Sequence, residues 1–358
     1  MTSVTKRFGI LTSGGDCPGL NAAIRGVCRA AYDKYGMIGV GFANGYRGLI
    51  SGDYRVLRRE DFWGILTRGG TILGSSREKP FKTGGADYDV VGEKVSAIKE
   101  NYHELKLDCL VVLGGNGAHS TAYRLAQEGL NVVGLPKTID NDVQGTERCF
   151  GFHSALSIAT EAIDRLHTTA QSHNRVMVIE LMGHKTGWLA LYAGVAGGGD
   201  VILIPEIPYS AKIIGKRLKK RLEEGKGFSI VVVAEGAMSR EEAAMDKKER
   251  KRRRENVSIG YRVAREIECE ANIETRTTVL GYVQRGGVPS ASDRALATCL
   301  GATAADLLAR GEYNRMVSFT NDSVTSVDLS VPAGKSKTVP LDHYMLYTAL
   351  SVGACLGQ

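Results

Sequence analysis

Seven short runs rich in valine, isoleucine and leucine, separated by longer amphipathic stretches, constrain the fold of this chain more than any other feature. The runs lack clean alternation of apolar and polar residues, which is typical of parallel strands covered on both faces. We predict strands at 8–13, 107–113, 131–135, 175–181, 201–205, 228–236 and 276–284. We predict helices at 19–35, 117–129, 153–172, 209–224, 257–271 and 290–310. This alternation indicates right-handed βαβ units in open parallel sheets.

The length and composition fit two such sheets in one chain. With 358 residues we expect an α/β protein with two Rossmann-like lobes, each a mostly parallel sheet covered by helices. No apolar run approaches the roughly 20 residues of a membrane span, and the N-terminus leads directly into the first predicted strand, so we expect neither a membrane span nor a signal peptide. The seven cysteines form no CxxC pair, which favours a reducing compartment, so we expect a cytoplasmic protein.

A basic segment, DKKERKRRR at 246–254, contributes +5 of the formal net charge of +7. Just upstream, Ser239 and Glu242 fit a capping box, with acidic residues in the first turn and basic ones later. We predict a solvated surface helix near 239–256 whose charges complement its own dipole. A docking site for a nucleic acid, a phosphorylated metabolite or a partner protein is the alternative. No aromatic residues interleave the basic ones, so we expect no nucleic-acid partner.

A glycine-rich segment, LTSGGDCPGLN at 11–21, follows the first predicted strand and leads into a helix. Ligands of open α/β proteins bind beyond the carboxyl ends of such strands. Gly14 and Gly15 let the backbone approach a phosphate, and the helix start offers unpaired N–H groups. The segment is neither a Walker A loop nor GxGxxG, so a structural tight turn is the alternative.

Two further glycine-rich segments strengthen the phosphate interpretation. In VVLGGNGAHS, at 111–120, three glycines surround Asn116 between a strand and a helix. In RGGTILGSSR, at 68–77, the turn is followed by Arg77, whose forked donors suit a phosphate. Three such loops at one edge of a sheet indicate phosphoryl transfer.

An acidic segment, LPKTIDNDVQGT at 135–146, supplies the remaining groups that phosphoryl transfer needs. The reaction requires a metal site, a positioned acceptor hydroxyl and positive charge around the migrating group. Of Asp140 and Asp142, one carboxylate can accept the hydroxyl proton while the other holds Mg²⁺ or its waters. Lys137 and the arginines supply positive charge. Taken alone, the segment could also be a solvated turn rich in Asp and Asn.

Seven motifs in fixed order resemble the phosphofructokinase family from about residue 8 to 310: GGDCPGLNAAIRG, RGGTILGSSR, PKTIDND, EAIDRLHTTAQSHNR, AEG, ETR and VQRGG. The resemblance implies an ATP-dependent 6-phosphofructokinase of glycolysis, which phosphorylates the 1-hydroxyl of fructose 6-phosphate to fructose 1,6-bisphosphate with Mg²⁺. It implies a homo-oligomer, dimer or tetramer, with active sites completed across subunits. It also implies a phosphoryl-donor lobe of 1–151 plus 285–334 and a sugar-phosphate lobe of 152–284 plus 335–358.

The same resemblance implies roles for individual residues. Asp140 matches the general base, with Lys137 and Thr138 beside it, and Asn116 and Asp142 match the metal site. The donor-binding positions are Gly15, Tyr46, Arg77, Glu78, Gly114, Gly115, Asn116 and Gly117. The substrate-binding positions are Thr138, Asp140, Arg175, Met182, Gly183, His184, Glu235, Arg276, Tyr282 and Arg285. Two of these, Arg175 and Arg276, match arginines that reach across from a neighbouring subunit. Independently of the resemblance, Glu235 ends a buried strand, where a carboxylate needs hydroxyls or a salt bridge.

Three positions depart from the usual family pattern. The family commonly has aspartate where Asn116 stands, and asparagine offers a cation its carbonyl oxygen but no charge. His184 stands where arginine is usual, and Tyr282 replaces a histidine. These departures leave open a catalytically weak regulatory paralogue, although the Asp140 segment is intact. A kinase of lipids or nicotinamide nucleotides is a further alternative, but it would leave the sugar-phosphate arginines without a purpose.

Two positions, Gly117 and Lys137, bear on the identity of the phosphoryl donor, and they point in opposite directions. Pyrophosphate-dependent members of the family typically carry an acid where Gly117 stands, because an acid there repels the α-phosphate of a nucleotide. Glycine at that position favours ATP. Lys137 appears in pyrophosphate enzymes and in some ATP enzymes. We expect ATP, with pyrophosphate as the alternative donor.

Overall fold

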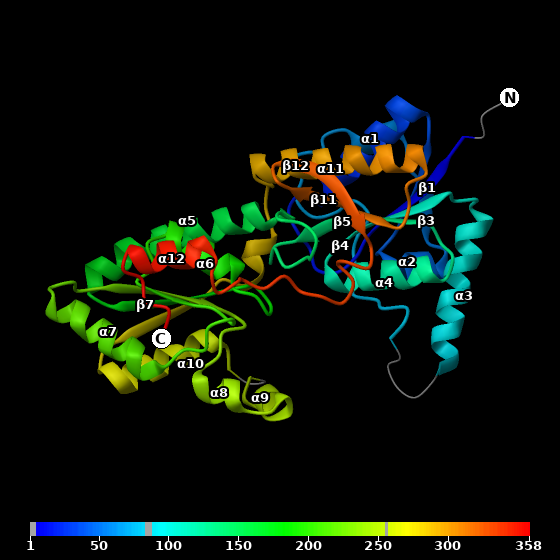
Figure 1. The fold of residues 1–358 in the computed structure, drawn as a ribbon. Coiled ribbons are helices and arrows are strands. Elements are labelled where there is room, and N and C mark those ends of the chain that lie inside the picture. Colours follow the sequence, from blue (N-terminus) through cyan, green and yellow to red (C-terminus); the bar gives the residue numbers. More distant parts are fainter. Residues whose placement is uncertain (1–4, 83–87, 255–256) are drawn as a thin grey trace. The chain divides into compact units, whose positions relative to one another are not determined.

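The computed structural model describes residues 5–82, 88–254 and 257–358. The chain divides into two compact units, one of Met1–Ser154 and Arg285–Ser336, the other of Ala155–Gln284 and Lys337–Gln358. Each unit is a mostly parallel sheet with helices on both faces (Figure 1), which confirms the predicted fold class. Within the described ranges, no helix is both long and apolar enough to cross a membrane.

The sheet of the first unit has the strand order β12-β11-β5-β4-β1-β2-β3, with β6 paired to β5. Its strands are β1 (Arg7–Thr12), β2 (Ile38–Phe42), β3 (Tyr54–Val56), β4 (Cys109–Gly114), β5 (Val132–Thr138), β6 (Phe150–Gly151), β11 (Arg315–Thr320) and β12 (Ser323–Asp328). The antiparallel strands β3 and β12 form the two edges. The order reverses between β1 and β4, and such a reversal opens a crevice at the carboxyl ends of the two strands. The loops that follow β1 and β4 therefore flank a natural ligand site.

Helices cover both faces of this sheet (Figure 1). On one face, α1 (Leu20–Tyr35) lies against α11 (Ala291–Arg310). On the other face lie α2 (Tyr46–Ser51), α3 (Tyr88–Glu104) and α4 (Asn116–Gln127), and a 3-10 helix, η1 (Arg59–Phe62), precedes α3. The core of that second face joins apolar side chains of the strands, such as Phe42 and Val112, to Ile98 of α3 and Leu125 of α4.

Glycines allow α1 and α11 to approach closely, and this makes a stability prediction. A Cβ on Gly301 would lie 2.7 Å from both Ala23 O and Val27 N, which are backbone atoms that cannot move aside. We expect Gly301→Ala to lower the free energy of unfolding by about 1–3 kcal/mol, as overpacking commonly does. Gly92 on α3 has no atom within 4 Å of such a Cβ, so Gly92→Ala is the matched control. It should stabilise the protein by about 0.5–1 kcal/mol. Denaturant unfolding measures both, and equal stabilities would contradict the close packing.

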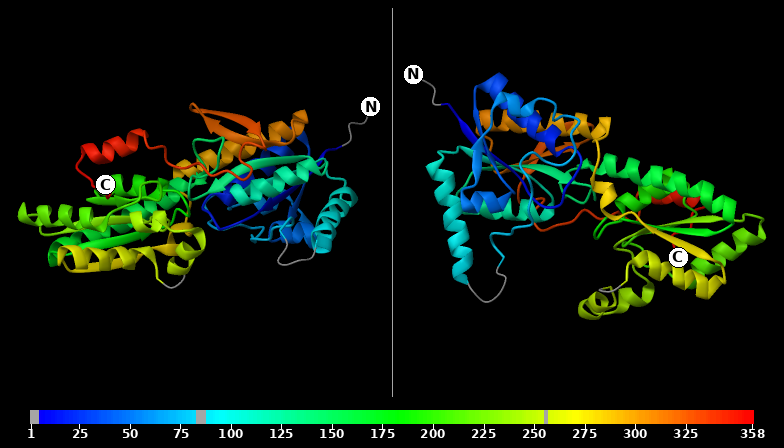
Figure 2. Two further views of the ribbon diagram at one scale, coloured as in Figure 1. Left: turned by 60° about the horizontal axis from the view of Figure 1, so that its bottom comes forward. Right: turned by 180° about the vertical axis from the view of Figure 1, so that it is seen from behind.

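The sheet of the second unit has the order β10-β7-β9-β8 and is entirely parallel. Its strands are β7 (Val176–Leu181), β8 (Val201–Leu203), β9 (Ser229–Ala234) and β10 (Thr275–Val279). On one face, α7 (Ala211–Glu223) and α10 (Ile259–Ala271) pack with side chains such as Ile214 and Val263 against Val178 and Val231. On the other face lie α5 (Phe152–His173), α6 (Trp188–Ala196) and α12 (Tyr344–Ser351) (Figure 2).

Most predicted boundaries lie within two residues of the observed ones, and three differ in an informative way. The strand β5 continues to Thr138, so Lys137 and Thr138 belong to a strand end rather than to a loop. The strand predicted at 276–284 is wrong beyond Val279, because Gly281 adopts a left-handed conformation (φ 51°) and starts a 3-10 helix, η2 (Gly281–Arg285).

The predicted charged helix is two helices, α8 (Arg240–Ala244) and α9 (Lys247–Arg254). The chain turns extended at Met245 and so ends α8. The capping box is confirmed, since Ser239 Oγ accepts the N–H of Glu242 and the Glu242 carboxylate accepts the N–H of Ser239. The end of the predicted segment, 255–256, lies outside the described residues.

Candidate active site

The loop after β1 is joined to two other parts of the first unit. The N–H of Ser13 donates to Leu113 O of β4 at 3.0 Å, and the N–H of Gly14 donates to Ser76 O at 2.9 Å. Ser75 Oγ donates back to Gly14 O at 2.8 Å. Two of the glycine-rich segments predicted from the sequence are thus side by side. Gly14 has a φ of 96°, a conformation that favours glycine.

The glycines after β4 differ in how much space surrounds them. A Cβ on Gly114 would lie 2.2 Å from the Ala118 side chain, so Gly114 lets the strand end pack against α4. Gly115 is the N-cap of α4. Gly117, in the first turn of α4, is exposed, and a Cβ there would meet only the end of the Lys79 side chain at 3.9 Å. The surface at Gly117 is therefore open to a ligand.

Two cationic side chains meet the loop after β1. Lys137, at the end of β5, donates from Nζ to Gly15 O at 2.5 Å. Arg285 donates from Nη1 to Asp16 O at 2.8 Å, and a Cβ on Gly15 would lie 2.8 Å from that Nη1. Burial lowers the pKa of Lys137. The backbone of 14–16, which the sequence predicted to approach a phosphate, thus carries two basic groups beside it.

The loop that carries Asp140 is held on a fixed turn. The N–H of Asp140 donates to Thr138 Oγ1 at 3.0 Å, and both residues are buried. Asn141 has a left-handed φ of 51°; its Nδ2 donates to Glu147 O at 3.1 Å, and its Oδ1 accepts the N–H of Cys149 at 3.0 Å. No motif in the sequence indicates this bracing role of Asn141, although asparagine is one of the few residues that tolerate this conformation.

Asn116 and Asp142, which the family resemblance implies as metal-site positions, lie together. Asn116 Nδ2 donates to Asp142 Oδ2 at 2.8 Å, and Asn116 Oδ1 is buried with no hydrogen-bond partner among the described residues. An unpartnered carbonyl oxygen beside a carboxylate suits a hard cation. No three His, Cys, Asp or Glu side chains gather around a metal position in the described chain. The residues present therefore fit a Mg²⁺ that takes its other ligands from phosphate and water, as Mg²⁺ commonly does.

Three other donor-side positions have different surroundings. Tyr46 is fully buried, and its hydroxyl donates to Ala118 O at 2.9 Å, so it supports the start of α4 from the core. The hydroxyl of Tyr46, a predicted donor-binding position, is therefore engaged in a hydrogen bond within the first unit. Arg77 is exposed at the end of the 68–77 segment. The Glu78 carboxylate forms an ion pair with Lys94 Nζ at 2.7 Å.

In the second unit, several predicted substrate positions follow the carboxyl ends of neighbouring strands. Met182, Gly183 and His184 follow β7, Glu235 follows β9, and Tyr282 lies on η2 after β10. Glu235 Oε1 accepts the N–H of Gly183 at 3.3 Å and that of His184 at 2.5 Å, so this carboxylate holds the loop after β7. Gly183 has a φ of 148°, and a Cβ there would lie 2.6 Å from Thr186 O. His184 and Tyr282 are exposed.

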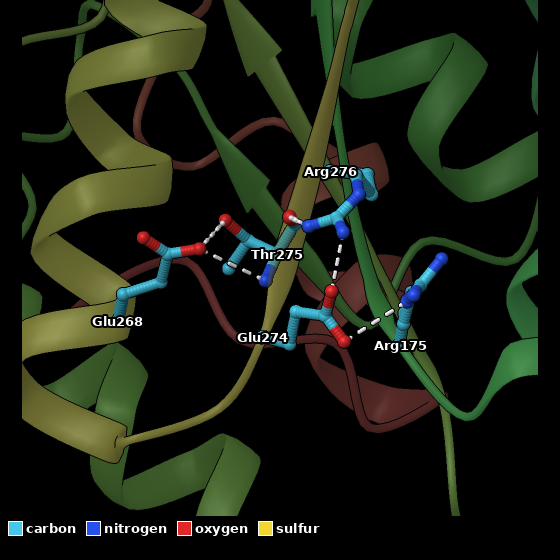
Figure 3. Close-up of polar contacts among 5 residues, drawn as sticks. All are labelled: Arg175, Glu268, Glu274, Thr275 and Arg276. Carbon is cyan, nitrogen blue, oxygen red and sulfur yellow. Dashed lines mark hydrogen bonds and ion pairs between the residues drawn. The ribbon is translucent and has the colours of Figure 1, made fainter.

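Arg175 and Arg276 lie at the opposite end of the same strands, where β7 and β10 begin. Arg175 immediately precedes β7, and Arg276, near the start of β10, pairs with Met177. Met182 follows Arg175 by seven positions, with β7 between them, which at about 3.3 Å per residue is about 23 Å. Both arginines instead contact Glu274 (Figure 3). The predicted substrate residues of the second unit thus form two separate groups.

The glycine loops after β1 and β4 lie at the topological switch point of the sheet, and Lys137, Arg285 and the ordered turn of Asp140 belong to the same unit. These are features of α/β proteins that bind phosphorylated ligands. The family model for Phosphofructokinase matches residues 7–308, and the chain belongs to that family. It is 64% identical to the ATP-dependent 6-phosphofructokinase of Spirochaeta thermophila, over 99% of this chain and 98% of that one. It is 45% identical to the pyrophosphate–fructose 6-phosphate 1-phosphotransferase of Amycolatopsis mediterranei, over 94% and 97%.

A solved structure gives the same family. The T-state phosphofructokinase of Pichia pastoris matches 98% of this chain with a TM-score of 0.81 and 31% identity. The chain spans only 37% of that longer protein.

Proposed function

We propose that this protein is an ATP-dependent 6-phosphofructokinase, which transfers the γ-phosphoryl group of ATP to the 1-hydroxyl of fructose 6-phosphate in glycolysis. One observation carries the proposal: buried Asp140 lies on a braced turn that directly follows Lys137, and Lys137 contacts the glycine loop after β1. The high identity to ATP-dependent relatives supports it.

In this mechanism Asp140 accepts the proton of the sugar hydroxyl as that oxygen attacks the phosphoryl group. Lys137 and Arg285 offset the charge that develops on the migrating group, and the backbone N–H groups of the glycine loops orient the donor phosphates. Asn116 and Asp142 would hold Mg²⁺, which supplies further positive charge to the phosphates. We accordingly propose a donor-binding lobe of 1–151 plus 285–334, which lies within the first unit.

We propose a sugar-phosphate lobe of 152–284 plus 335–358, which contains the whole second unit. The loop of Met182, Gly183 and His184 would line the sugar, with Tyr282 nearby. Glu235 already orders that loop, and its carboxylate can accept hydrogen bonds from sugar hydroxyls. Binding of the sugar phosphate should therefore depend on Glu235 in two ways: through its hydrogen bonds to the loop after β7 and through its hydrogen bonds to the sugar hydroxyls.

We propose that the enzyme works as a homo-oligomer. Arg175 and Arg276 lie about one full strand length away from Met182 and Glu235. Within one copy, the two groups therefore cannot hold the same small sugar phosphate. A neighbouring copy supplying the two arginines resolves the separation, as the family resemblance implies. The cytoplasm is the proposed compartment, because its reducing conditions suit seven unpaired cysteines.

Pyrophosphate is the second candidate donor, favoured by Lys137 and by the similarity to the Amycolatopsis enzyme. An assay that follows fructose 1,6-bisphosphate with Mg²⁺ and each donor in turn separates the candidates. We expect kcat/KM with ATP to exceed that with pyrophosphate by at least about tenfold, because the space at Gly117 admits a nucleotide. Turnover with pyrophosphate but not ATP would overturn the choice of donor. No turnover with either would overturn the kinase assignment.

A further inference from the structure

A single glutamate, Glu274, joins Arg175 and Arg276 at the amino-terminal ends of the strands of the second sheet (Figure 3). Glu274 Oε2 accepts from Arg175 Nε at 3.0 Å. Its other oxygen, Oε1, accepts from Nη2 of Arg276. The guanidinium group of a residue just before β7 and that of a residue in β10 therefore converge on one carboxylate.

The two arginines differ in which donors they use: Arg276 directs Nη1 to Thr275 O and Nη2 to Glu274, which leaves Nε and the second hydrogen of each terminal nitrogen. Arg175 uses only Nε toward Glu274, and Figure 3 shows the far end of its guanidinium turned away from that carboxylate. The side chains of Arg175 and Arg276 are 29% and 50% exposed, so an approaching anion can reach both. The two terminal nitrogens of Arg175 form a bidentate donor pair, which is the usual way in which arginine binds phosphate.

The backbone beneath the cluster is also anchored. Glu268 Oε1, from α10, accepts the N–H of Thr275 at 3.1 Å and its hydroxyl at 2.8 Å. The carbonyl of Thr275 accepts from Arg276 Nη1 at 2.8 Å. The guanidinium group of Arg276 is thus fixed by two contacts, one to the carbonyl of Thr275 and one to the carboxylate of Glu274 (Figure 3).

The charges of the cluster favour a bound anion. The three side chains that meet, Arg175, Arg276 and Glu274, carry a net charge of about +1, and the Glu268 carboxylate lies on the other side of Thr275 (Figure 3). Hydrogen bonding from Arg175 and the positive charge of both arginines lower the pKa of Glu274, so the carboxylate stays ionised near neutral pH. Without Glu274, two like charges would repel, and two long side chains would regain rotamer freedom that binding must then remove.

We propose that Glu274 is a positioning residue that fixes Arg175 and Arg276 so that their remaining N–H groups bind the phosphate of a fructose 6-phosphate held by a second copy of the chain. The inference rests on the proposed function. Glu274 itself does not contact the sugar phosphate; it acts through the two arginines.

Steady-state kinetics of Glu274→Ala tests the role. We expect KM for fructose 6-phosphate to rise by about tenfold with kcat within about threefold of wild type, because the phosphate lies far from the reacting hydroxyl and binds ground state and transition state alike. Glu274→Gln keeps an acceptor for one arginine and should give an intermediate KM. Glu312→Ala removes an exposed glutamate that is likewise paired with an arginine two residues away, Arg310, and should leave KM unchanged.

A double-mutant cycle distinguishes positioning from a general structural effect. In an Arg175→Ala background, Glu274→Ala should raise KM by less than about threefold, because one of its two partners is already gone. Analytical ultracentrifugation at assay concentration checks that each variant keeps the wild-type assembly. An unchanged KM in Glu274→Ala, or an equal rise in both backgrounds, would overturn the proposal.

If Glu274→Ala fails to assemble, Glu274→Gln decides: an assembled Gln variant with wild-type KM overturns the proposal, and one with raised KM supports it. If wild type turns over with neither donor, the proposed function fails. Equilibrium binding of fructose 6-phosphate to wild type and Glu274→Gln then tests Glu274 separately, with weaker binding to the variant expected and equal binding overturning the inference.

Discussion

Asp140→Asn is expected to lower kcat by about 10²–10⁴-fold while KM for both substrates changes little, because loss of a general base removes proton transfer but not substrate contacts. Asparagine has the shape of aspartate, and the turn depends on the Asp140 N–H to Thr138 and on Asn141, which both remain. The fold around the site should therefore be unchanged. Steady-state kinetics with saturating ATP and fructose 6-phosphate measures the effect.

Asp322→Asn serves as the matched control for this substitution. Asp322 is exposed in the turn between β11 and β12 and has a left-handed φ of 54°, which asparagine also tolerates. Its kcat should equal that of wild type. Near-normal turnover of Asp140→Asn, with the same reaction products, would show that another group takes the proton.

Gly117→Asp is expected to lower kcat/KM for ATP by about 10²-fold and to affect pyrophosphate far less. Space at Gly117 is open, so the new carboxylate fits without disturbing α4. It would face the α-phosphate of a nucleotide, and two like charges about 4 Å apart near a surface repel by up to about 4 kcal/mol. Pyrophosphate has no third phosphate to repel. Kinetics with each donor in turn measures the change in preference.

Gly117→Asn, which adds similar volume without charge, separates crowding from repulsion. It should lower kcat/KM for ATP much less than Gly117→Asp does. Equal losses for both variants would show that space rather than charge sets donor choice. Unchanged ATP kinetics in Gly117→Asp would place the nucleotide away from the start of α4.

The parallel sheets were readable from the sequence because strands buried on both faces must be apolar throughout, as in LVVL of β4 or VVV of β9. Elements at edges carry no such signal. The strand β12, SVTSVD, is half polar because one side faces solvent, and it was missed. β2, IGVGF, was missed because its glycines interrupt the apolar run. The end of β10 was overextended because the apolar residues of η2, Tyr282 and Val283, mimic a strand although both are exposed.

For the candidate site, the sequence predicted which segments meet, because glycine loops after parallel strands share one edge of a sheet. The family resemblance implies that Asn116 and Asp142 belong to one metal site, and the two side chains lie together. The sequence could not predict contacts made across the chain by single side chains, such as Lys137 with Gly15 or Arg285 with Asp16, since no local pattern encodes them. The burial of Tyr46 could not be predicted either, because a tyrosine that follows a turn in the sequence is compatible both with a core position and with a ligand site.

The most direct test of the central claim is the identity of the product formed by the purified wild-type protein with ATP, Mg²⁺ and fructose 6-phosphate, followed by phosphorus NMR. We predict a new phosphate monoester resonance on C1 of the sugar, appearing at the rate at which ADP forms. Formation of ADP without that resonance, or phosphorylation at another carbon, would contradict an aspartate that deprotonates the 1-hydroxyl.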